Sequence, residues 1–287
     1  MNLAQKLGYP ANTKLLMIHA DDAGLSHSEN LATMQSLEKG VVNSYSIMVP
    51  CPWFYEMALW AKKHPHYDHG VHLTLTCEWE RYRFGPTLPA AEVPSLVDAN
   101  GHFYKKREEV QQYATVADVK KELTAQIETF LSYGLTPSHL DSHMYSVGSR
   151  PDLFEVYKEL GERYKLPIQR GRDLTDMVGL EDKEPLTVNA IPVDKVHIGD
   201  MAYFEKGKLW DYYESVFDNL IEGFNVILIH TAFDDMEMQG ITVNHPNFGA
   251  AWRQIDYDFF TSDLAKKLVG SPAIQLINWT TIQKILV

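Results

Sequence analysis

The sequence predicts an α/β fold in which seven or eight strand–helix units form a distorted (β/α) barrel, in a single domain over residues 1–287. Short apolar runs alternate along the chain with longer amphipathic segments, the order that joins parallel strands through crossover helices. So many units in fewer than 300 residues fit a barrel better than an open sheet. No internal repeat or Gly/Ser-rich linker interrupts the alternation, so no domain boundary is predicted.

Each expected strand is a short apolar run that ends in turn residues or leads into a helix signal. The first run, KLLMIHA, ends directly before Asp21 and Asp22. The expected strands are Lys14–Ala20, Val42–Val49, Val71–Thr76, Ser138–Asp141, Pro167–Gln169, Val196–Ile198, Val226–His230 and Ala273–Ile277.

The helices are expected where capping residues open an amphipathic stretch and a glycine ends it. Thr115 with Asp118, for example, has the spacing of a capping box, and Gly134 follows as a stop. Helices are expected from Ser28 to Gly40, over Trp53–Lys63, over Val116–Tyr133, from Pro151 onward, and over about Ala250–Leu268.

Two segments do not fit the alternation. Cys77–Thr115 is a long excursion with several aromatic residues, and Gly171–Val193 is polar and contains proline. Loops of this length in a compact domain usually cover an active site or are disordered. We therefore expect the excursion over about residues 77–115 to lie near the active site.

Composition narrows the function classes. There are 38 acidic and 26 basic residues, for a formal charge of −12, and such a surface repels nucleic acid. Cys51 and Cys77 match no metal or disulfide spacing and are expected as core thiols in a reducing compartment. The N-terminus lacks the apolar run of a signal peptide, and no stretch approaches the roughly 20 apolar residues of a membrane span. A cytoplasmic enzyme without a membrane partner is expected, or an exported one if a signal had been removed.

Acidic and histidine residues stand at the ends of the expected strands. Asp21 and Asp22 follow the first strand, His72 lies in the third, His143 follows the fourth, and His230 ends the penultimate one. In a barrel the carboxyl ends of the strands meet on one face, where the chemistry of this fold is found. One Asp and two His make a facial ligand set for a divalent ion. Zn²⁺ suits it best, Ni²⁺, Co²⁺ and Mn²⁺ are permitted, and Mg²⁺ prefers more oxygen ligands.

Each of these residues has a plainer interpretation. The acidic pair could complement a helix dipole, His72 could be a hydrogen-bonded core histidine, and His230 could be the same. His139 or Asp141 could orient a metal ligand through a hydrogen bond. His245 is expected in a loop, and the cluster His64, His66 and His69 on an exposed turn.

Three motifs resemble, in order and spacing, signatures of the YdjC-like carbohydrate deacetylases, which include chitooligosaccharide and hopanoid-linked glycan deacetylases. They are HADDAGLSHSEN (His19–Asn30), GVHLTLT (Gly70–Thr76) and HLDSHMY (His139–Tyr145), and VNSYSIMVPCPWF (Val42–Phe54) adds to them. The resemblance implies a distorted barrel related to polysaccharide deacetylases. It implies a divalent ion on Asp22, His72 and His143, with Asp21 as catalytic base. His230 resembles the family's general acid, although Ile-His-Thr-Ala stands where Cys-His-Pro-Gly is usual.

The activity implied is hydrolysis of N-acetyl groups on amino sugars or short oligosaccharides, giving acetate and a free amine. The expected partner is therefore a small carbohydrate, and a homodimer is possible. Flat side chains that could contact sugar rings are Trp53, Trp79, Tyr82 and Phe84, with Arg83 reaching a polar substituent. The alternative is that they are core aromatics of an ordered excursion. Arg253 is placed with the substrate-binding residues, or it pairs with Asp256 to position a catalytic group; a surface helix pair is the rival interpretation.

Functions of other classes remain open. A metal-dependent sugar isomerase or epimerase would share the fold but would normally need more carboxylate ligands and a Lys or Glu proton shuttle. A phosphoesterase would usually need a second metal ion. A non-catalytic glycan-binding protein would be expected to have lost at least one of Asp21, Asp22, His72 and His143.

Overall fold

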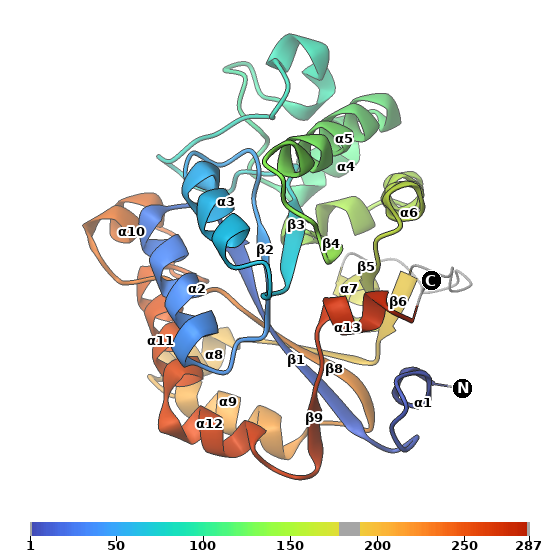
Figure 1. Ribbon diagram of the computed structural model, residues 1–287. Helices are drawn as coiled ribbons and strands as arrows, with labels where there is room; N and C mark the ends of the chain where they lie inside the picture. Colours follow the sequence, from blue (N-terminus) through green and yellow to red (C-terminus); the bar gives the residue numbers. More distant parts are fainter. Residues whose placement is uncertain (1, 178–189, 286–287) are drawn as a thin grey trace.

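All strand pairings of the main sheet are parallel, in the order β6-β5-β4-β3-β2-β1-β8-β7, with β9 paired to β1. The computed structural model describes residues 2–177 and 190–285 (Figure 1). The strands are β1 (Lys14–Ala23), β2 (Ser44–Ile47), β3 (His69–Leu73), β4 (His139–Ser142), β5 (Ile168–Gly171), β6 (Ala190–Val193), β7 (Lys195–Ile198), β8 (Gly223–Ile229) and β9 (Ile274–Leu276).

The two ends of the sheet are joined by one bent segment. β6 pairs with β5, β7 pairs with β8, and only Asp194 stands between β6 and β7. The backbone of Asp194 donates to Phe224 O over 2.9 Å, and its Oδ2 accepts from Phe224 N over 2.8 Å. Gly223 is required beside this corner, because a Cβ there would stand 2.4 Å from Asp194 Oδ2. The sheet is thus nearly closed, and the predicted (β/α) barrel is confirmed.

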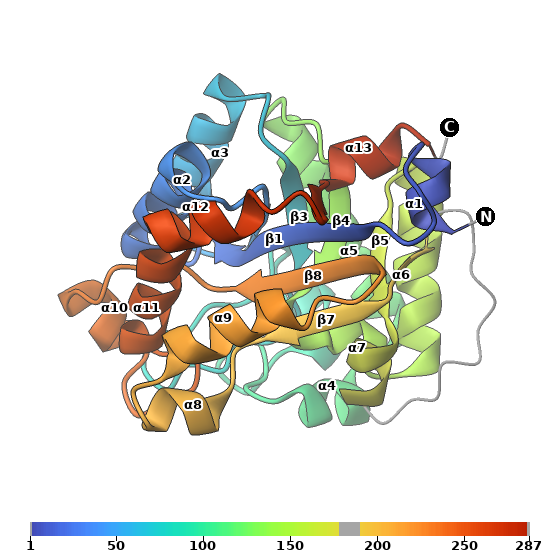
Figure 2. The same ribbon diagram turned by 90° about the horizontal axis from the view of Figure 1, so that it is seen from below.

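Helices surround the strands, as the two perpendicular views show (Figures 1 and 2). They are α1 (Leu3–Lys6), α2 (His27–Lys39), α3 (Phe54–Lys63), α4 (Arg107–Tyr113), α5 (Val116–Ser132), α6 (Pro151–Tyr164), α7 (Arg172–Met177), α8 (Met201–Glu205), α9 (Leu209–Asp218), α10 (Met236–Ile241), α11 (Ala250–Thr261), α12 (Asp263–Val269) and α13 (Trp279–Gln283). Short 3₁₀ turns cover Ala90–Glu92, Pro94–Leu96 and His143–Gly148. Within the described ranges no helix has the length and apolar character needed to cross a bilayer.

Some sequence expectations need correction. The single helix expected over Ala250–Leu268 is two helices, because the Ser262 hydroxyl caps α12 by accepting from Ala265 N over 3.1 Å. His69 is not on an exposed turn: it lies in β3, is 4% exposed, and its Nδ1 is 2.6 Å from the Tyr45 hydroxyl. The segment Gly171–Val193, expected to be irregular, contains α7 and β6, and its residues 178–189 lie outside the described ranges.

A candidate metal centre at the carboxyl ends of the strands

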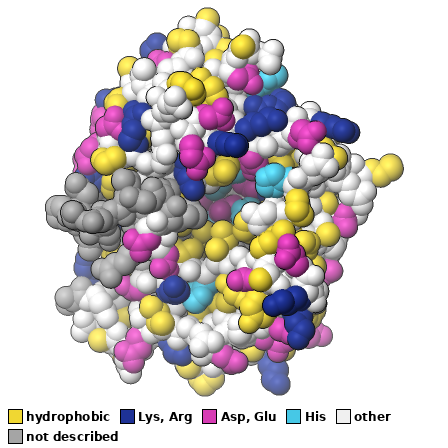
Figure 3. Space-filling model, turned by 180° about the vertical axis from the view of Figure 1, so that it is seen from behind, with side chains coloured by type: hydrophobic (Ala, Val, Ile, Leu, Met, Phe, Trp, Pro, Cys, Tyr) yellow, Lys and Arg dark blue, Asp and Glu magenta, His cyan; other side chains and the backbone are white. Residues whose placement is uncertain are grey.

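The fold brings the widely spaced acidic and histidine residues to one cavity. Asp21 and Asp22 come from the end of β1, His72 from β3, His143 from the residue after β4, and His230 from the residue after β8. All five line a cavity of about 330 Å³. The space-filling view shows a hollow with acidic and histidine side chains at its floor and apolar side chains along one rim (Figure 3).

A break in the regular geometry of β1 lets both adjacent carboxylates face this cavity. Successive residues of a strand normally point to opposite sides of the sheet. Here the register against β2 shifts between Ala20 and Ala23, and Asp22 has a left-handed φ of 67°. Such backbone costs of order 1–3 kcal/mol and is concentrated at functional sites. Met144 and Tyr145, directly after His143, also have positive φ values of 51° and 50°.

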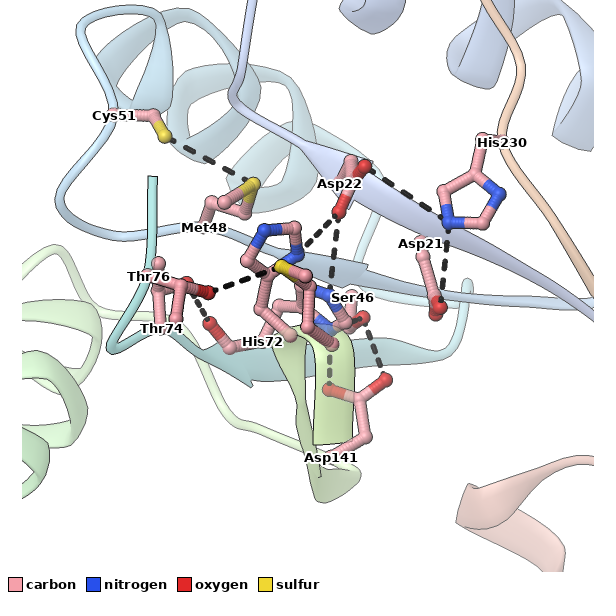
Figure 4. A network of polar contacts seen from close by, with 12 residues as sticks. Asp21, Asp22, Ser46, Met48, Cys51, His72, Thr74, Thr76, Asp141 and His230 are labelled. Atoms are coloured by element: carbon pink, nitrogen blue, oxygen red, sulfur yellow. Dashed lines mark hydrogen bonds and ion pairs between the residues drawn. The ribbon is translucent and has the colours of Figure 1, made fainter. Parts of the chain in front are cut away.

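Three donor atoms converge as a metal would require. Asp22 Oδ1 lies 3.1 Å from His143 Nδ1 and 3.3 Å from His72 Nε2. The three side chains are 1–4% exposed, and their donor atoms lie within 4.8 Å of one another. Figure 4 shows Asp22 and His72 pointing toward each other from neighbouring parts of the sheet. One carboxylate oxygen and two imidazole nitrogens form a set that suits a divalent ion with open positions.

The second nitrogen of each imidazole is held by a carboxylate. His72 Nδ1 lies 3.0 Å from Asp141 Oδ1, and His143 Nε2 lies 3.0 Å from Glu78 Oε2. Metal-binding histidines commonly have such partners, which fix the ring orientation and the tautomer. The donor set and these outer contacts together fit a bound divalent cation.

The electrostatics favour a cation between these groups. Burial alone would raise the pKa of Asp22, but His143 and Arg253 hold that pKa well below its ordinary value. Burial lowers the pKa of His143, yet Glu78 and Asp22 outweigh burial and raise it to about 9. Burial also opposes a charge on His72, but the Asp141 and Asp21 carboxylates raise its pKa well above the usual range. An environment that stabilises a proton here also stabilises a metal ion.

Arg253 and Asp256 are buried residues of α11 and do not form a surface pair. The Arg253 guanidinium donates to Asp22 Oδ2 and to Glu29 Oε2, each over 2.8 Å, and its Nε donates to a backbone carbonyl. Asp256 Oδ2 accepts from the backbone of His230 over 3.0 Å, and its Oδ1 accepts from the Tyr213 hydroxyl. Arg253 does line the cavity, but its hydrogen bonds position Asp22.

Asp21 and His230 face each other beside the donor set. His230 Nε2 lies 3.8 Å from Asp21 Oδ2 and 3.9 Å from Asp22 Oδ2 (Figure 4). Burial lowers the pKa of His230 to about 4; Asp22 opposes this shift and Arg253 reinforces it. His230 is therefore neutral near pH 7, with a ring nitrogen directed at the two carboxylates.

The predicted sugar-contacting residues are divided by the structure. Trp79 lines the cavity, with its ring beneath Arg253 and against His245, although only 1% of it is exposed. The others lie outside the cavity lining. Trp53 packs on His27 with ring centroids 4.8 Å apart. Phe84 is 6% exposed and packs edge-on against another ring, which matches the core-aromatic alternative.

Tyr82 and Arg83 have structural contacts within or beside the excursion. The Tyr82 hydroxyl donates to Leu25 O over 2.6 Å. The Arg83 guanidinium donates to the backbone carbonyls of Cys77, Trp79 and Phe103. The chain's own carbonyl groups thus occupy the Arg83 donors that a substrate would need.

Sequence reasoning did not identify Glu78, Tyr145 or Phe248, which also line the cavity. Glu78 is one of 38 acidic residues, and nothing in its neighbourhood marks it. Phe248 reaches the cavity through a loop with a left-handed backbone, φ 53°, and its ring lies tilted against that of His230, with centroids 4.7 Å apart. His245, expected as a loop residue of little weight, lines the cavity in the same loop.

The two outer carboxylates give a direct prediction for metal affinity. Asp141→Asn and Glu78→Gln are each expected to weaken Zn²⁺ binding by about 10–100-fold, because each leaves one imidazole ligand less firmly oriented. Isothermal titration of stripped protein with Zn²⁺ measures this. Glu80→Gln is the matched control, since the hydrogen bond of Glu80 within the described residues comes from the exposed Asn244 amide over 2.8 Å. Unchanged Zn²⁺ affinity in Asp141→Asn and Glu78→Gln would show that these carboxylates do not orient the imidazole ligands.

The fold and the site define the class: a (β/α)-barrel protein with an Asp-His-His centre at the carboxyl ends of its strands. The family model described as YdjC-like protein matches residues 15–270, and the chain belongs to the YdjC-like family. A carbohydrate deacetylase of Geobacillus stearothermophilus is 33% identical over 223 residues, which cover 77% of this chain and 81% of the relative.

Two further comparisons agree. A carbohydrate deacetylase of Thermus thermophilus is 38% identical over 166 residues, covering 58% of this chain and 56% of that protein. Among solved structures, a protein of Enterococcus faecalis described as a candidate for cellobiose-phosphate cleavage superposes with a TM-score of 0.75 at 26% identity. It covers 94% of this chain and 99% of its own.

Proposed function

We propose that this protein is a metal-dependent deacetylase that hydrolyses N-acetyl groups of amino sugars or short oligosaccharides to acetate and a free amine. The observation that carries the proposal is the buried donor set Asp22, His72 and His143, with Asp21 and His230 beside it at the cavity floor. The carbohydrate deacetylase names of the relatives support the reaction class. Zn²⁺ is the proposed ion, because imidazole and carboxylate ligands suit it best.

A divalent ion on Asp22, His72 and His143, when bound, supplies polarisation of the amide carbonyl and a lowered pKa for water. Asp21 is placed to accept a proton from the attacking water while the oxygen of that water adds to the amide carbonyl carbon. Arg253, at 2.8 Å from Asp22 Oδ2, keeps that ligand in place throughout.

The amine must gain a proton when the C–N bond breaks. His230 Nε2, at 3.8 Å from Asp21 Oδ2, is placed to receive the proton that Asp21 took and to pass it to the amine nitrogen. A neutral His230 at rest fits this sequence, because a ring whose pKa is lowered to about 4 can accept a proton before it passes one on. The products are acetate and the free amino sugar.

Tyr145 supplies a candidate contact for a sugar hydroxyl. Its side chain lines the cavity, and its buried hydroxyl has no hydrogen-bond partner among the described residues. An unpaired buried hydroxyl costs about 1–3 kcal/mol, so a ligand that pairs with it gains affinity. Tyr145→Phe is therefore expected to raise KM by about 3–10-fold, the worth of one hydrogen bond, with kcat retained.

Two measurements on Tyr145→Phe separate binding from folding. Steady-state kinetics give KM and kcat, and urea unfolding gives stability, which should rise because the unpaired hydroxyl is gone. A lower stability would show that the hydroxyl has a protein partner. An unchanged KM would remove Tyr145 from substrate recognition.

The proposed function is tested by acetate release from a panel of N-acetylated mono- and disaccharides. Metal-stripped protein receives Zn²⁺, Ni²⁺, Co²⁺ or Mg²⁺ in separate reactions. Release that requires a metal supports the proposal and identifies the substrate class. An ion bound without release, together with sugar interconversion, would establish the isomerase or epimerase alternative; glycan binding without either reaction would establish the non-catalytic one.

A further inference from the structure

His19 lies in β1 three residues before Asp22, and its side chain is completely buried. Its Nδ1 is 2.8 Å from Ser44 Oγ. Its Nε2 is 2.9 Å from Asp141 Oδ2, 3.2 Å from Asp21 Oδ1 and 3.2 Å from Ser46 Oγ. The ring thus connects the proposed base to the carboxylate that orients His72.

The direction in which the Ser44 hydroxyl donates determines whether His19 Nδ1 carries a proton. Ser44 Oγ donates to Asp68 Oδ2 over 2.6 Å. Asp68 acts as the acceptor, because its carboxyl group also receives the backbone N–H groups of Trp279 and Thr280 at the start of α13, over 3.0 and 2.7 Å, and the Thr280 hydroxyl over 2.6 Å. A hydroxyl has one hydrogen to give, so Ser44 must accept from His19, and Nδ1 carries a proton.

The hydrogen-bond partners of His19 Nε2 determine in the same way whether this nitrogen carries a proton. Both carboxylate oxygens that face it are acceptors when ionised. The Ser46 hydroxyl donates its single hydrogen to Asp141 Oδ2 over 2.7 Å, so it cannot also donate to the His19 ring. Asp141 is surrounded by donors: Oδ1 is 3.0 Å from His72 Nδ1, and Oδ2 accepts from Ser46 Oγ and lies 2.9 Å from His19 Nε2, an arrangement that favours the ionised carboxylate. Nε2 therefore carries a proton as well.

We propose that His19 is a permanently charged imidazolium, and that it is a positioning residue which fixes Asp21 and Asp141 with one buried cation. The role for Asp21 as base rests on the proposed function. The charge state itself rests on the hydrogen bonds alone. Through Asp141, His19 also steadies the orientation of the metal ligand His72.

The surroundings agree with a lasting charge. The titratable groups that face the ring are Asp21, Asp141, Asp68 through Ser44, and His139, whose ring lies edge-on at 5.1 Å. Burial lowers the pKa of His19, and the two aspartates overcome burial and raise it to about 9.

The charge on His19 also decides whether the cluster of His19, His139 and Asp141 can bind a metal ion. His19, His139 and Asp141 have donor atoms close enough for a second metal ion. A metal needs a lone pair on His19 Nε2, and an imidazolium has none. The cluster of His19, His139 and Asp141 is therefore not expected to bind an ion, and the ion is expected on Asp22, His72 and His143.

Nitrogen NMR of the full chain tests the charge state directly. Protein labelled with ¹⁵N-histidine and loaded with Zn²⁺ is titrated from pH 6.5 to 8.5, and the His19 signals are assigned by their loss in His19→Asn. The expected spectrum shows both His19 ring nitrogens protonated at pH 7. A neutral ring at pH 7, or two Zn²⁺ ions per chain with one on His19, would overturn the proposal. Neither outcome depends on finding a substrate, so a failure of the His19 proposal can be told apart from a failure of the proposed deacetylase function.

Kinetics then test the positioning role. His19→Asn is expected to lower kcat by about 10–100-fold, the usual effect of losing an outer partner, with KM changed less than about twofold and one Zn²⁺ still bound. His139→Gln is the matched control from the same buried cluster, because His139 Nε2 has no hydrogen-bond partner among the described residues. An equal loss of kcat in both variants, or none in His19→Asn, would contradict the role. If His19→Asn fails to fold, His19→Gln supplies the assignment instead, and the spectrum of the wild-type protein then decides the charge.

Discussion

Acetate release by Asp21→Asn is expected to be about 10³-fold slower than in the unaltered protein, because general base catalysis contributes about 10²–10⁴-fold. Asn has the same shape but cannot accept the proton of the attacking water. Asp21 is not one of the three proposed metal donors, so the variant should bind one ion with nearly unchanged affinity. Single-turnover acetate release and metal content of the same sample measure both quantities.

The neighbouring residue provides the matched comparison. Asp22→Asn removes a carboxylate ligand and the partner of Arg253, so it should lose the ion and the activity together. The two adjacent carboxylates would then differ: Asp21→Asn loses activity but keeps the ion, whereas Asp22→Asn loses both. If Asp21→Asn also lost the ion, or if it kept full activity, the separation of base from ligand would be wrong.

Arg253→Met is expected to lower the free energy of unfolding by about 3–5 kcal/mol, the effect of removing one partner from a buried ion pair. The Arg253 side chain is 1% exposed and bonds to Asp22 and Glu29, which are equally buried. Burial and neighbouring carboxylates already raise the pKa of Glu29 well above its ordinary value, with Arg253 opposing them. Without Arg253, Glu29 loses the cation that opposes this shift, and Asp22 loses one of the groups that, together with His143, hold its pKa low.

Urea unfolding of metal-stripped protein measures this loss. Adding Glu29→Gln to Arg253→Met should restore part of the stability, because one unpaired charge is then removed. Lys120→Met is the control: Lys120 pairs with Glu159 at 2.6 Å, but both side chains are about half exposed, and such pairs contribute about 0–1 kcal/mol. A loss below about 1 kcal/mol for Arg253→Met would show that Arg253 does not neutralise a buried charge.

The sequence predicts the barrel and the five acidic and histidine residues at its strand ends that line the cavity. The barrel follows from the alternation of apolar runs and capped helices, because parallel strands need helical crossovers. Asp22, His72 and His143 converge because each stands at or near the carboxyl end of a strand. These patterns are local, and the topology then determines where they meet.

Other features depend on long-range contacts that no local pattern shows. Arg83 looks like a substrate-binding cation, but three backbone carbonyls of its own excursion occupy it. His69 belongs to a His-rich turn in the sequence, yet β3 begins there and buries it against Tyr45. Glu78 gains its importance only because the excursion brings it to His143, 65 positions away.

The most direct test of the metal-dependent deacetylase proposal is to titrate Zn²⁺ into stripped protein while measuring bound ion per chain and acetate release in the same samples. We predict that release rises in proportion to occupancy and levels off at one ion per chain, and that His72→Ala and His143→Ala abolish both. Acetate release by the stripped protein, or full release in either variant without bound ion, would contradict the proposal.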